Sequence, residues 1–192
     1  FSADTGAKAV AGILAEPDFK KGAGTDRDVY DLAIIGAGVS GLCAAIEARK
    51  AGLNFVMYEA DEPFSTIHNF PRKKPIYTYP TDMQQAGELQ FKSDIKEDLL
   101  DELRAQQESH GIETTQAKVA HITRCGGILT IEFTGEQAPV KSQRVIVAIG
   151  RTGNFRKLNV PGESLDKVSN RLIDASEHNG QKVLVVGGGD SA

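Results

Sequence analysis

The sequence predicts an α/β protein built on a parallel β-sheet, and three observations support this fold class. A buried strand, a glycine-rich turn, an apolar helix and a second strand follow one another between residues 30 and 58. Apolar, β-branched segments between 119 and 149 indicate a β-meander whose last strand returns to the sheet. The final stretch, QKVLVVGGGDSA, repeats the pattern of strand and glycine turn. Together these features predict a doubly wound domain that leads into the start of a second one.

The first unit along the chain is a strand-helix-strand motif preceded by a weakly patterned segment. Residues 1–28 combine a faint helical period with a charged, glycine-rich stretch, which favours an N-terminal arm and linker. A strand is then expected over 30–35 and a helix over 39–51, which Gly52 is placed to end in a left-handed conformation. A buried strand over 54–58 completes the unit.

The middle of the chain predicts a long loop and one further helix. Residues 60–92 lack a clear period, and a loop of this length in a compact domain is usually functional. Asp94 and Glu97 have the spacing of a capping box, which predicts a helix that runs to Gly111.

Short strands are predicted in the second half of the chain. Gly126 and Gly127 suit a tight turn between the first two strands of the meander. The segment RVIVAIG is apolar on both faces, as expected of a strand inside a parallel sheet. The expected strands cover 112–115, 119–123, 128–133, 143–149 and 182–186, with irregular connections before the last one.

The composition of the chain indicates which binding partners and which cellular location to expect. The chain has 192 residues, 40% of them hydrophobic, and a formal net charge of −4. Because nucleic acids and anionic membranes attract basic surfaces, neither is expected as a partner. All apolar runs are much shorter than the roughly 20 residues that a membrane-spanning helix needs, so we expect a soluble, cytoplasmic protein. Cys43 and Cys125 form neither a CxxC pair nor a zinc spacing, and no metal site is expected.

The first glycine turn has the chemistry of a dinucleotide-binding site. Gly36, Gly38 and Gly41 stand in the GxGxxG spacing between a strand and a helix. The first glycine permits the tight turn, the second lets a pyrophosphate approach the backbone, and the third lets helix and strand pack closely. The helix amino end supplies N–H donors to phosphate, and Glu59 is placed to accept from a ribose diol. The other interpretation is a purely structural turn with Glu59 as a solvated charge.

A second turn of this type changes the functional prediction. Gly187, Gly189 and Ala192 stand in the related GxGxxA spacing, again after an apolar run. Neither turn has the Gly-Lys-Ser/Thr ending of a nucleoside-triphosphate site. Two dinucleotide turns imply two dinucleotides, and in hydride transfer one site holds a flavin while the other presents a nicotinamide.

Three stretches carry a resemblance to a known family. They are YDLAIIGAGVSGLCAAIEARKAGLNFVMYEA, RVIVAIGRTGNFRKLNVPGE and KVLVVGGGDSA. In this order they resemble the landmarks of the two-dinucleotide-binding-domain flavoprotein reductases, the pyridine nucleotide-disulfide oxidoreductases, and in particular their thioredoxin-reductase-like branch. The resemblance covers about Tyr30 to Ala192, and the first 28 residues show none. It implies that hydride passes from NAD(P)H to FAD and then to a disulfide or another electron acceptor.

The resemblance also implies which residues hold each cofactor. Glu59 would hold the adenosine ribose and Val119 would meet adenine through its backbone. The implied FAD contacts are Gly36, Gly38, Val39, Ser40, Gly41, Glu59, Ala60, Thr66, Val119, Ala148 and Gly150. The implied nicotinamide-dinucleotide contacts are Gly187, Gly189, Asp190, Ser191 and Ala192. No catalytic residue can be named from the sequence.

Domain boundaries follow from these assignments. We expect the arm and linker over 1–28, the amino-terminal part of a Rossmann-type FAD-binding domain over 29–153, and a crossover over 154–180. Residues 181–192 would be the first strand and glycine turn of a truncated NAD(P)-binding domain. Phe64 and Ser65 stand where many relatives have a Gly-Gly pair close to the flavin, so side chains are expected beside the cofactor.

The expected partners are the two cofactors, together with a disulfide substrate or a small electron-carrier protein, and a homodimer is also allowed. The CxxC pair of thioredoxin reductases and most of the second domain are absent from this sequence, so the chain by itself is expected not to turn over. Two alternatives stay open: a flavin-dependent monooxygenase, which would share both glycine turns, and a non-catalytic FAD-binding module.

Overall fold

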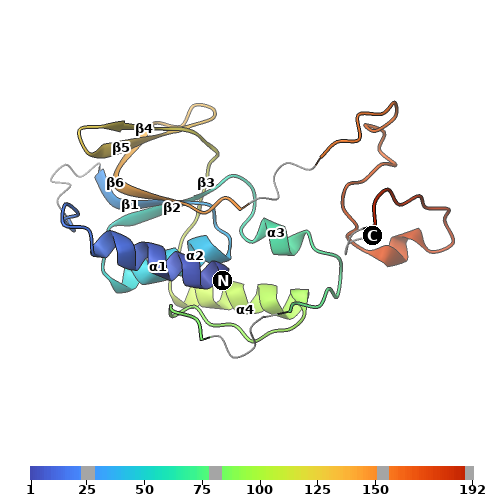
Figure 1. Cartoon of the computed structure of the whole chain (residues 1–192), viewed down its shortest axis with the longest axis horizontal. Helices are drawn as coiled ribbons and strands as arrows, with labels where there is room; N and C mark the ends of the chain where they lie inside the picture. Colours follow the sequence, from blue (N-terminus) through green and yellow to red (C-terminus); the bar gives the residue numbers. More distant parts are fainter. Residues whose placement is uncertain (23–28, 78–83, 151–155, 189–192) are drawn as a thin grey trace.

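A twisted, mixed β-sheet forms the centre of the protein in a computed structural model that describes residues 1–22, 29–77, 84–150 and 156–188 (Figure 1). Within these ranges the strands form one six-stranded sheet in the order β3-β2-β1-β6-β5-β4. The elements are α1 (Ser2–Leu14), β1 (Val29–Ile35), α2 (Val39–Lys50), β2 (Phe55–Glu59), α3 (Ser65–His68), α4 (Lys96–Ser109), β3 (Thr115–Gln116), β4 (Val119–Cys125), β5 (Ile128–Phe133), β6 (Val140–Val147) and the 3-10 helix η1 (Ala175–His178).

The parallel part of the sheet is centred on β1. Ile34 pairs with Met57 of β2 on one side and with Ile146 of β6 on the other, both in parallel register. From Leu32 to Ile34 the strand is fully buried, because helices cover one face of the sheet and the meander covers the other. The expected α/β class, with a meander strand returning to a parallel core, is therefore confirmed.

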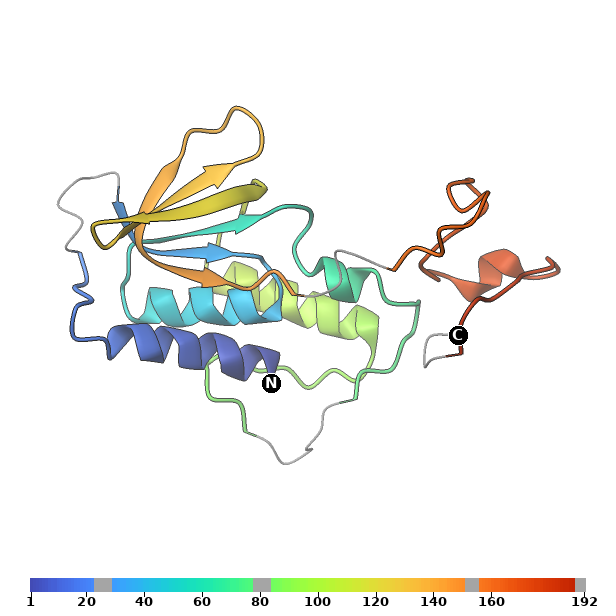
Figure 2. The same cartoon turned by 45° about the horizontal axis from the view of Figure 1, so that its top comes forward.

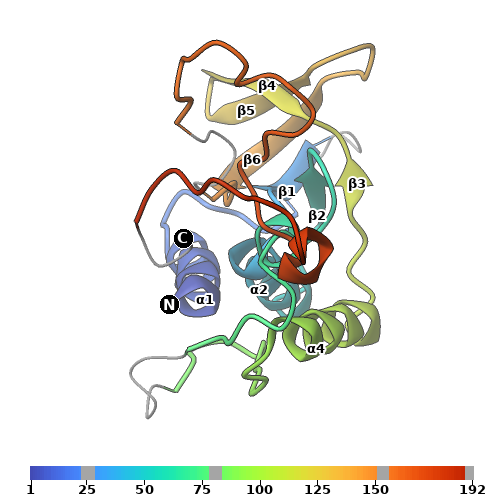
Figure 3. The same ribbon diagram turned by 90° about the vertical axis from the view of Figure 1, so that its right-hand side faces the viewer.

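Helices α1, α2 and α4 lie side by side beneath the sheet (Figure 3). The central helix α2 is rich in alanine, and seven of its twelve residues are buried. Its last turn ends as predicted, because Gly52 follows it with a φ of +65°.

The segment expected as an arm contributes a helix to the core instead. Ala3, Ala7, Val10 and Ile13 form the buried stripe of α1 at helical spacing, and they belong to the same apolar cluster as α2. The residues after α1 are also attached to the sheet, since Arg144 of β6 pairs with Glu16 at 2.6 Å and with Asp18 at 3.0 Å.

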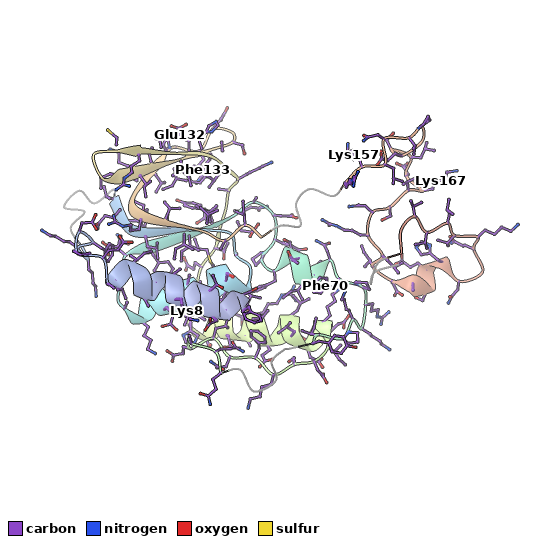
Figure 4. All side chains as sticks on the ribbon, in the orientation of Figure 1. Lys8, Phe70, Glu132, Phe133, Lys157 and Lys167 are labelled. Atoms are coloured by element: carbon purple, nitrogen blue, oxygen red, sulfur yellow. The ribbon has the colours of Figure 1, made fainter. Side chains whose placement is uncertain are left out.

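The meander curls over the opposite face of the sheet. Its hairpin turn is formed by Gly126 and Gly127 at φ +56° and +89°, as the sequence predicts. Phe133 points from β5 toward the parallel strands (Figure 4) and packs edge-on against Tyr58, with ring centroids 4.7 Å apart. Burial in this second cluster raises the pKa of Tyr58 to about 12.

The predicted capping box does not form. Helix α4 begins after Ile95, whose side chain cannot cap, and the carboxylate of Glu97 accepts from the backbone N–H of Lys73 at 3.1 Å. A β-bridge between Pro75 and Ile95 brings the two segments together. The Glu97 carboxylate therefore accepts from a residue distant in sequence, and not from the N-cap N–H that a capping box would have used.

Two predicted strands differ from the structure. The strand expected over 112–115 is only Thr115–Gln116. Residues 182–186 form no strand, and Val183 to Val186 are exposed by 56% to 87%. A strand needs a neighbour for its backbone groups, and none of the described residues pairs with this run. It belongs to a segment, 156–188, that extends away from the sheet and carries the labelled Lys157 and Lys167 (Figure 4).

In the described ranges, no helix is both long enough and apolar enough to cross a bilayer. Those ranges also contain no cluster of three His, Cys, Asp or Glu residues that would bind a metal ion.

Candidate dinucleotide-binding site

The glycine turn between β1 and α2 requires its first glycine. Gly36 has a φ of +108°, which L side chains rarely adopt. A Cβ at this position would lie 2.5 Å from the carbonyl oxygen of Ala148, at the end of β6. Ala148 is fixed there because its N–H donates to the carbonyl of Ile35 at 2.7 Å. The structure therefore brings Ala148, a predicted site residue, directly against the turn.

The other two glycines of the motif have different surroundings. A Cβ on Gly41 would collide with the carbonyl oxygen of Gly36, so this glycine permits the helix to pack on the strand. A Cβ on Gly38 would meet nothing within 4 Å. Gly36 and Gly41 are thus needed for packing, while Gly38 leaves open space at the helix amino end. This division matches the three glycine roles of a pyrophosphate-binding turn.

The first turn of α2 presents backbone donors. The helix begins at Val39 with Gly38 at the N-cap, and no side chain caps it. Its first N–H groups have no partner within the helix and lie at the positive end of the helix dipole. The Ser40 hydroxyl donates to the carbonyl of Ser2 at 2.7 Å. The donors that this turn offers to an anion are therefore main-chain N–H groups, because the hydroxyl proton is already used.

Glu59 lies where the sequence places it, at the carboxyl end of β2 beside the turn. Its Oε2 accepts from the N–H of Ala37 at 2.7 Å, and its Oε1 accepts from Ala60 at 2.8 Å and Asp61 at 3.1 Å. A carboxylate has about four acceptor positions, so roughly one is left for a ligand hydroxyl. The contact with Ala37 was not predicted, because nothing in the sequence marks that N–H as the partner of a residue in the next strand.

An open hollow of about 320 Å³ lies beside Glu59. It is bounded by residues at the ends of β2 and β3 and by the loop after β2, namely Glu59, Asp61, Glu62, Pro63, Thr114 and Gln116. Val119, the residue predicted to meet adenine, does not line this hollow. It lies at the start of β4 and packs against the cluster that contains Tyr58 and Phe133. Glu59 is the residue that links the hollow to the turn, because it lines the hollow and also accepts from the N–H of Ala37.

The loop after β2 returns to the glycine turn through Phe64. Its N–H donates to the carbonyl of Ala37 at 3.1 Å, and its side chain is only 2% exposed. The aromatic ring is therefore packed in the apolar core. Phe64 has a φ of +61°, a left-handed conformation that favours glycine. Thr66 follows it in the short helix α3.

The remaining predicted site residues are farther along the chain. Gly150 follows β6 with a φ of +66° and has open space around it. Gly187 ends the exposed apolar run with a φ of +128°. Gly189, Asp190, Ser191 and Ala192 lie outside the described residues.

The thiol nearest to the turn is suited to packing and not to chemistry. Cys43 is fully buried in α2, and burial together with the charge of Glu47 raises its pKa to about 11. The described part of the site therefore consists of backbone donors, the Glu59 carboxylate and a hollow that Asp61 and Glu62 also line. Backbone donors and a carboxylate are groups suited to binding and orienting a ligand, and the described residues here include no reactive thiol.

Comparison with known proteins identifies relatives that share this part of the fold. A family model for pyridine nucleotide-disulphide oxidoreductases matches residues 33–192. The chain is 29% identical over 171 residues to a thioredoxin reductase of Peptoclostridium acidaminophilum, covering 86% of this chain and 49% of that protein. It is 26% identical over 162 residues to a ferredoxin-NADP reductase of Ignicoccus hospitalis, covering 84% and 50%. The chain thus spans about half the length of these curated relatives.

Solved structures show the same fold. A bacillithiol disulfide reductase from Bacillus cereus superimposes with a TM-score of 0.68 at 23% identity, covering 78% of this chain and 48% of that one. A thioredoxin reductase from Lactococcus lactis gives 0.54 at 25% identity, covering 70% and 39%. The observed sheet therefore corresponds to the FAD-binding, Rossmann-type portion of thioredoxin-reductase-like proteins. Since the family model matches well over half of the residues, the chain belongs to the pyridine nucleotide-disulphide oxidoreductase family.

Proposed function

We propose that this chain is the FAD-binding part of an NAD(P)H-dependent flavoprotein reductase. The observation that carries the proposal is the glycine turn, in which Gly36 and Gly41 pack against protein while Gly38 faces open space. Only the second glycine of this set lies where a ligand must come close to the backbone. The thioredoxin and ferredoxin-NADP reductases among the relatives agree with this assignment.

In this proposal the chain binds FAD mainly through its backbone. The N–H groups at Gly38, Val39, Ser40 and Gly41 hold the pyrophosphate at the amino end of α2. Glu59 keeps its bond to Ala37 and uses its remaining acceptor position for a ribose hydroxyl. Ala60, Thr66, Val119, Ala148 and Gly150 complete the FAD contacts.

FAD supplies the hydride-accepting chemistry when it is bound. In the whole protein, hydride comes from NAD(P)H held at a second turn, to which Gly187, Gly189, Asp190, Ser191 and Ala192 contribute. Electrons then pass to a disulfide or to a small electron-carrier protein. The names of the curated relatives support both classes of acceptor, since they include a thioredoxin reductase and a ferredoxin-NADP reductase.

A titration of the purified chain with FAD, followed by flavin fluorescence, tests the proposal. The matched variants are Gly38→Val and Gly188→Val, because a Cβ at either position meets nothing within 4 Å and neither glycine has a positive φ. We expect Gly38→Val to abolish FAD binding with little change in melting temperature, since its side chain fills the phosphate approach. Gly188→Val should bind FAD like the wild type. Equal binding by all three proteins would refute the assignment.

A second measurement, on the full-length protein, distinguishes a reductase from a monooxygenase and from a non-catalytic module. A flavin monooxygenase from Stenotrophomonas maltophilia shares the fold at 18% identity and a TM-score of 0.51, which shows the fold alone. Oxygen consumption coupled to hydroxylation of an added substrate would favour that activity. Transfer of electrons from NAD(P)H to a disulfide or to a carrier protein without oxygen would favour the reductase. FAD binding without any nicotinamide-driven bleaching would indicate a non-catalytic module.

A further inference from the structure

Helix α1 lies along α2 with both amino ends at the same end of the molecule (Figure 2). At that end the Ser40 hydroxyl donates to the carbonyl of Ser2, which joins the first turns of the two helices. One turn further, the Cα of Gly6 faces the backbone of α2. The family match begins at residue 33, so α1 is outside the region that the family model describes.

The contact at Gly6 is a contact between backbones. A Cβ on Gly6 would collide with the carbonyl oxygen of Ser40, and it would lie 3.1 Å from both the N of Ala44 and the Cβ of Cys43. Any side chain at this position would therefore push α1 away from the turn or displace the Ser40 peptide. The other glycine of the helix, Gly12, has nothing within 4 Å of its Cβ position. Only Gly6 is required for the approach.

A third segment holds α1 in place from the other side. The N–H of Ala86 donates to Asp4 Oδ1 at 3.3 Å, and the N–H of Glu88 donates to Glu47 of α2 at 2.7 Å. Between them, a Cβ on Gly87 would lie 2.9 Å from the Cβ of Ala7 and 2.9 Å from the Sγ of Cys43. Residues 86–88 thus contact both helices, at Asp4 and Ala7 of α1 and at Cys43 and Glu47 of α2.

We propose that α1 is a positioning element of the dinucleotide site, acting through Gly6 and the Ser2 carbonyl on the first turn of α2. The inference rests on the proposed function, in which that turn binds FAD. Packing of Gly6 on the Ser40 peptide fixes the direction of the neighbouring N–H groups. The bond to Ser2 uses the one proton of the Ser40 hydroxyl, so the hydroxyl is held in a single orientation. A turn that is already ordered loses less entropy when a phosphate binds.

The test compares Gly6→Ala with Gly12→Ala in the whole chain. Both changes exchange glycine for alanine inside the same helix and raise its helix propensity equally, but only the first introduces a collision. We expect Gly6→Ala to weaken FAD binding about tenfold, as overpacking of a tight contact does, while Gly12→Ala binds like the wild type. Amide hydrogen exchange over residues 36–44, measured without FAD, should become faster in Gly6→Ala and stay unchanged in Gly12→Ala.

A second variant protects the test against a folding defect. Gly87→Ala leaves the sequence of α1 unchanged, but its Cβ presses on Ala7 of α1 and on Cys43 of α2. It should weaken FAD binding and speed exchange over residues 36–44 as Gly6→Ala does. Ser40→Thr keeps the hydroxyl and should retain protection of the turn, whereas Ser40→Ala should lose part of it.

Two results would overturn the inference. One is unchanged exchange over 36–44 in Gly6→Ala and Gly87→Ala. The other is a lower melting temperature with unaltered exchange and FAD affinity, which would make α1 a purely stabilising helix. Wild-type protein that binds no FAD would refute the proposed function, and the exchange measurement would still decide whether α1 orders the turn.

Discussion

The carboxylate of Glu59 joins the end of β2 to the glycine turn by accepting from the N–H of Ala37 at 2.7 Å. Ala37 is only 1% exposed, so this N–H has no access to water if the carboxylate is removed. The residue predicted to recognise a ligand therefore also maintains the shape of the turn that would receive it.

Replacing Glu59 should affect both stability and binding. Glu59→Gln keeps one acceptor oxygen and loses the charge, so we expect the free energy of unfolding to fall by about 1–2 kcal/mol. Urea denaturation measures this change, and an FAD titration should show weaker binding. Glu136→Gln is the matched control, because Glu136 is exposed in the connection between β5 and β6 and its side chain has no ion pair or hydrogen bond with the described residues. Equal stability of the two variants would contradict the structural role of Glu59.

At position 64 a glycine variant should be more stable than an alanine variant, which is the reverse of the usual order. Its side chain is buried, so Phe64→Ala is expected to cost roughly 3 kcal/mol through the lost packing. Its φ of +61° penalises any Cβ, and Phe64→Gly should therefore be more stable than Phe64→Ala by about 1 kcal/mol. Thermal denaturation of the two variants checks the order. A less stable glycine variant would indicate that the left-handed conformation is not retained.

The pKa of Asp174 should report how residues 173–176 are held. Hydrogen bonds from the Ser176 hydroxyl and N–H, and then the Arg72 guanidinium at 3.2 Å, lower this pKa from 3.8 to about 2. A depressed pKa means that the ionised form stabilises the fold. The contribution of the Asp174 carboxylate to the free energy of unfolding is complete above pH 3.8 and is lost as the pH falls toward 2. The NMR shift of the Ser176 amide should titrate with a midpoint near 2, and Asp174→Asn should remove this titration. A midpoint near 3.8 would show that these bonds do not persist in solution.

The two cysteines should differ in reactivity. Burial raises the pKa of the Cys43 thiol to about 11, whereas Cys125 is exposed in the β4–β5 hairpin. Since the thiolate is the reactive form, a thiol reagent at pH 8 should modify one cysteine in the native protein and both after denaturation. Cys125→Ser should leave the native protein unreactive. Modification of Cys43 in that variant would show that α2 opens readily.

The parts of the fold that were predictable depend on local signals. Gly126 and Gly127 determine a hairpin turn by their own conformations, and the apolar pattern of β1 requires burial on both faces. The three glycines of the first turn lie at the junction of a strand and a helix, as their spacing predicts, and their binding roles stay predictions. Glu59 was located for the same reason.

The parts that were missed depend on contacts between distant segments. Gly6 has no local signal that distinguishes it from Gly12, although only Gly6 packs on α2. Glu97 has the spacing of a capping residue, but its carboxylate binds the N–H of Lys73, which a separate β-bridge brings near. The apolar run 183–186 has strand propensity, and propensity forms no strand without a neighbour to accept its hydrogen bonds.

That run has a consequence for how the chain behaves in concentrated solution. Val183, Leu184, Val185 and Val186 are consecutive, uncharged, β-prone and open to solvent. Six- or seven-residue segments of this kind are the usual starting points of intermolecular β-pairing and aggregation. A single lysine at Leu184, the most exposed of the four, would interrupt the segment without touching the core. We therefore expect the same four side chains that predict a strand in the sequence to lower the solubility of this polypeptide at high concentration.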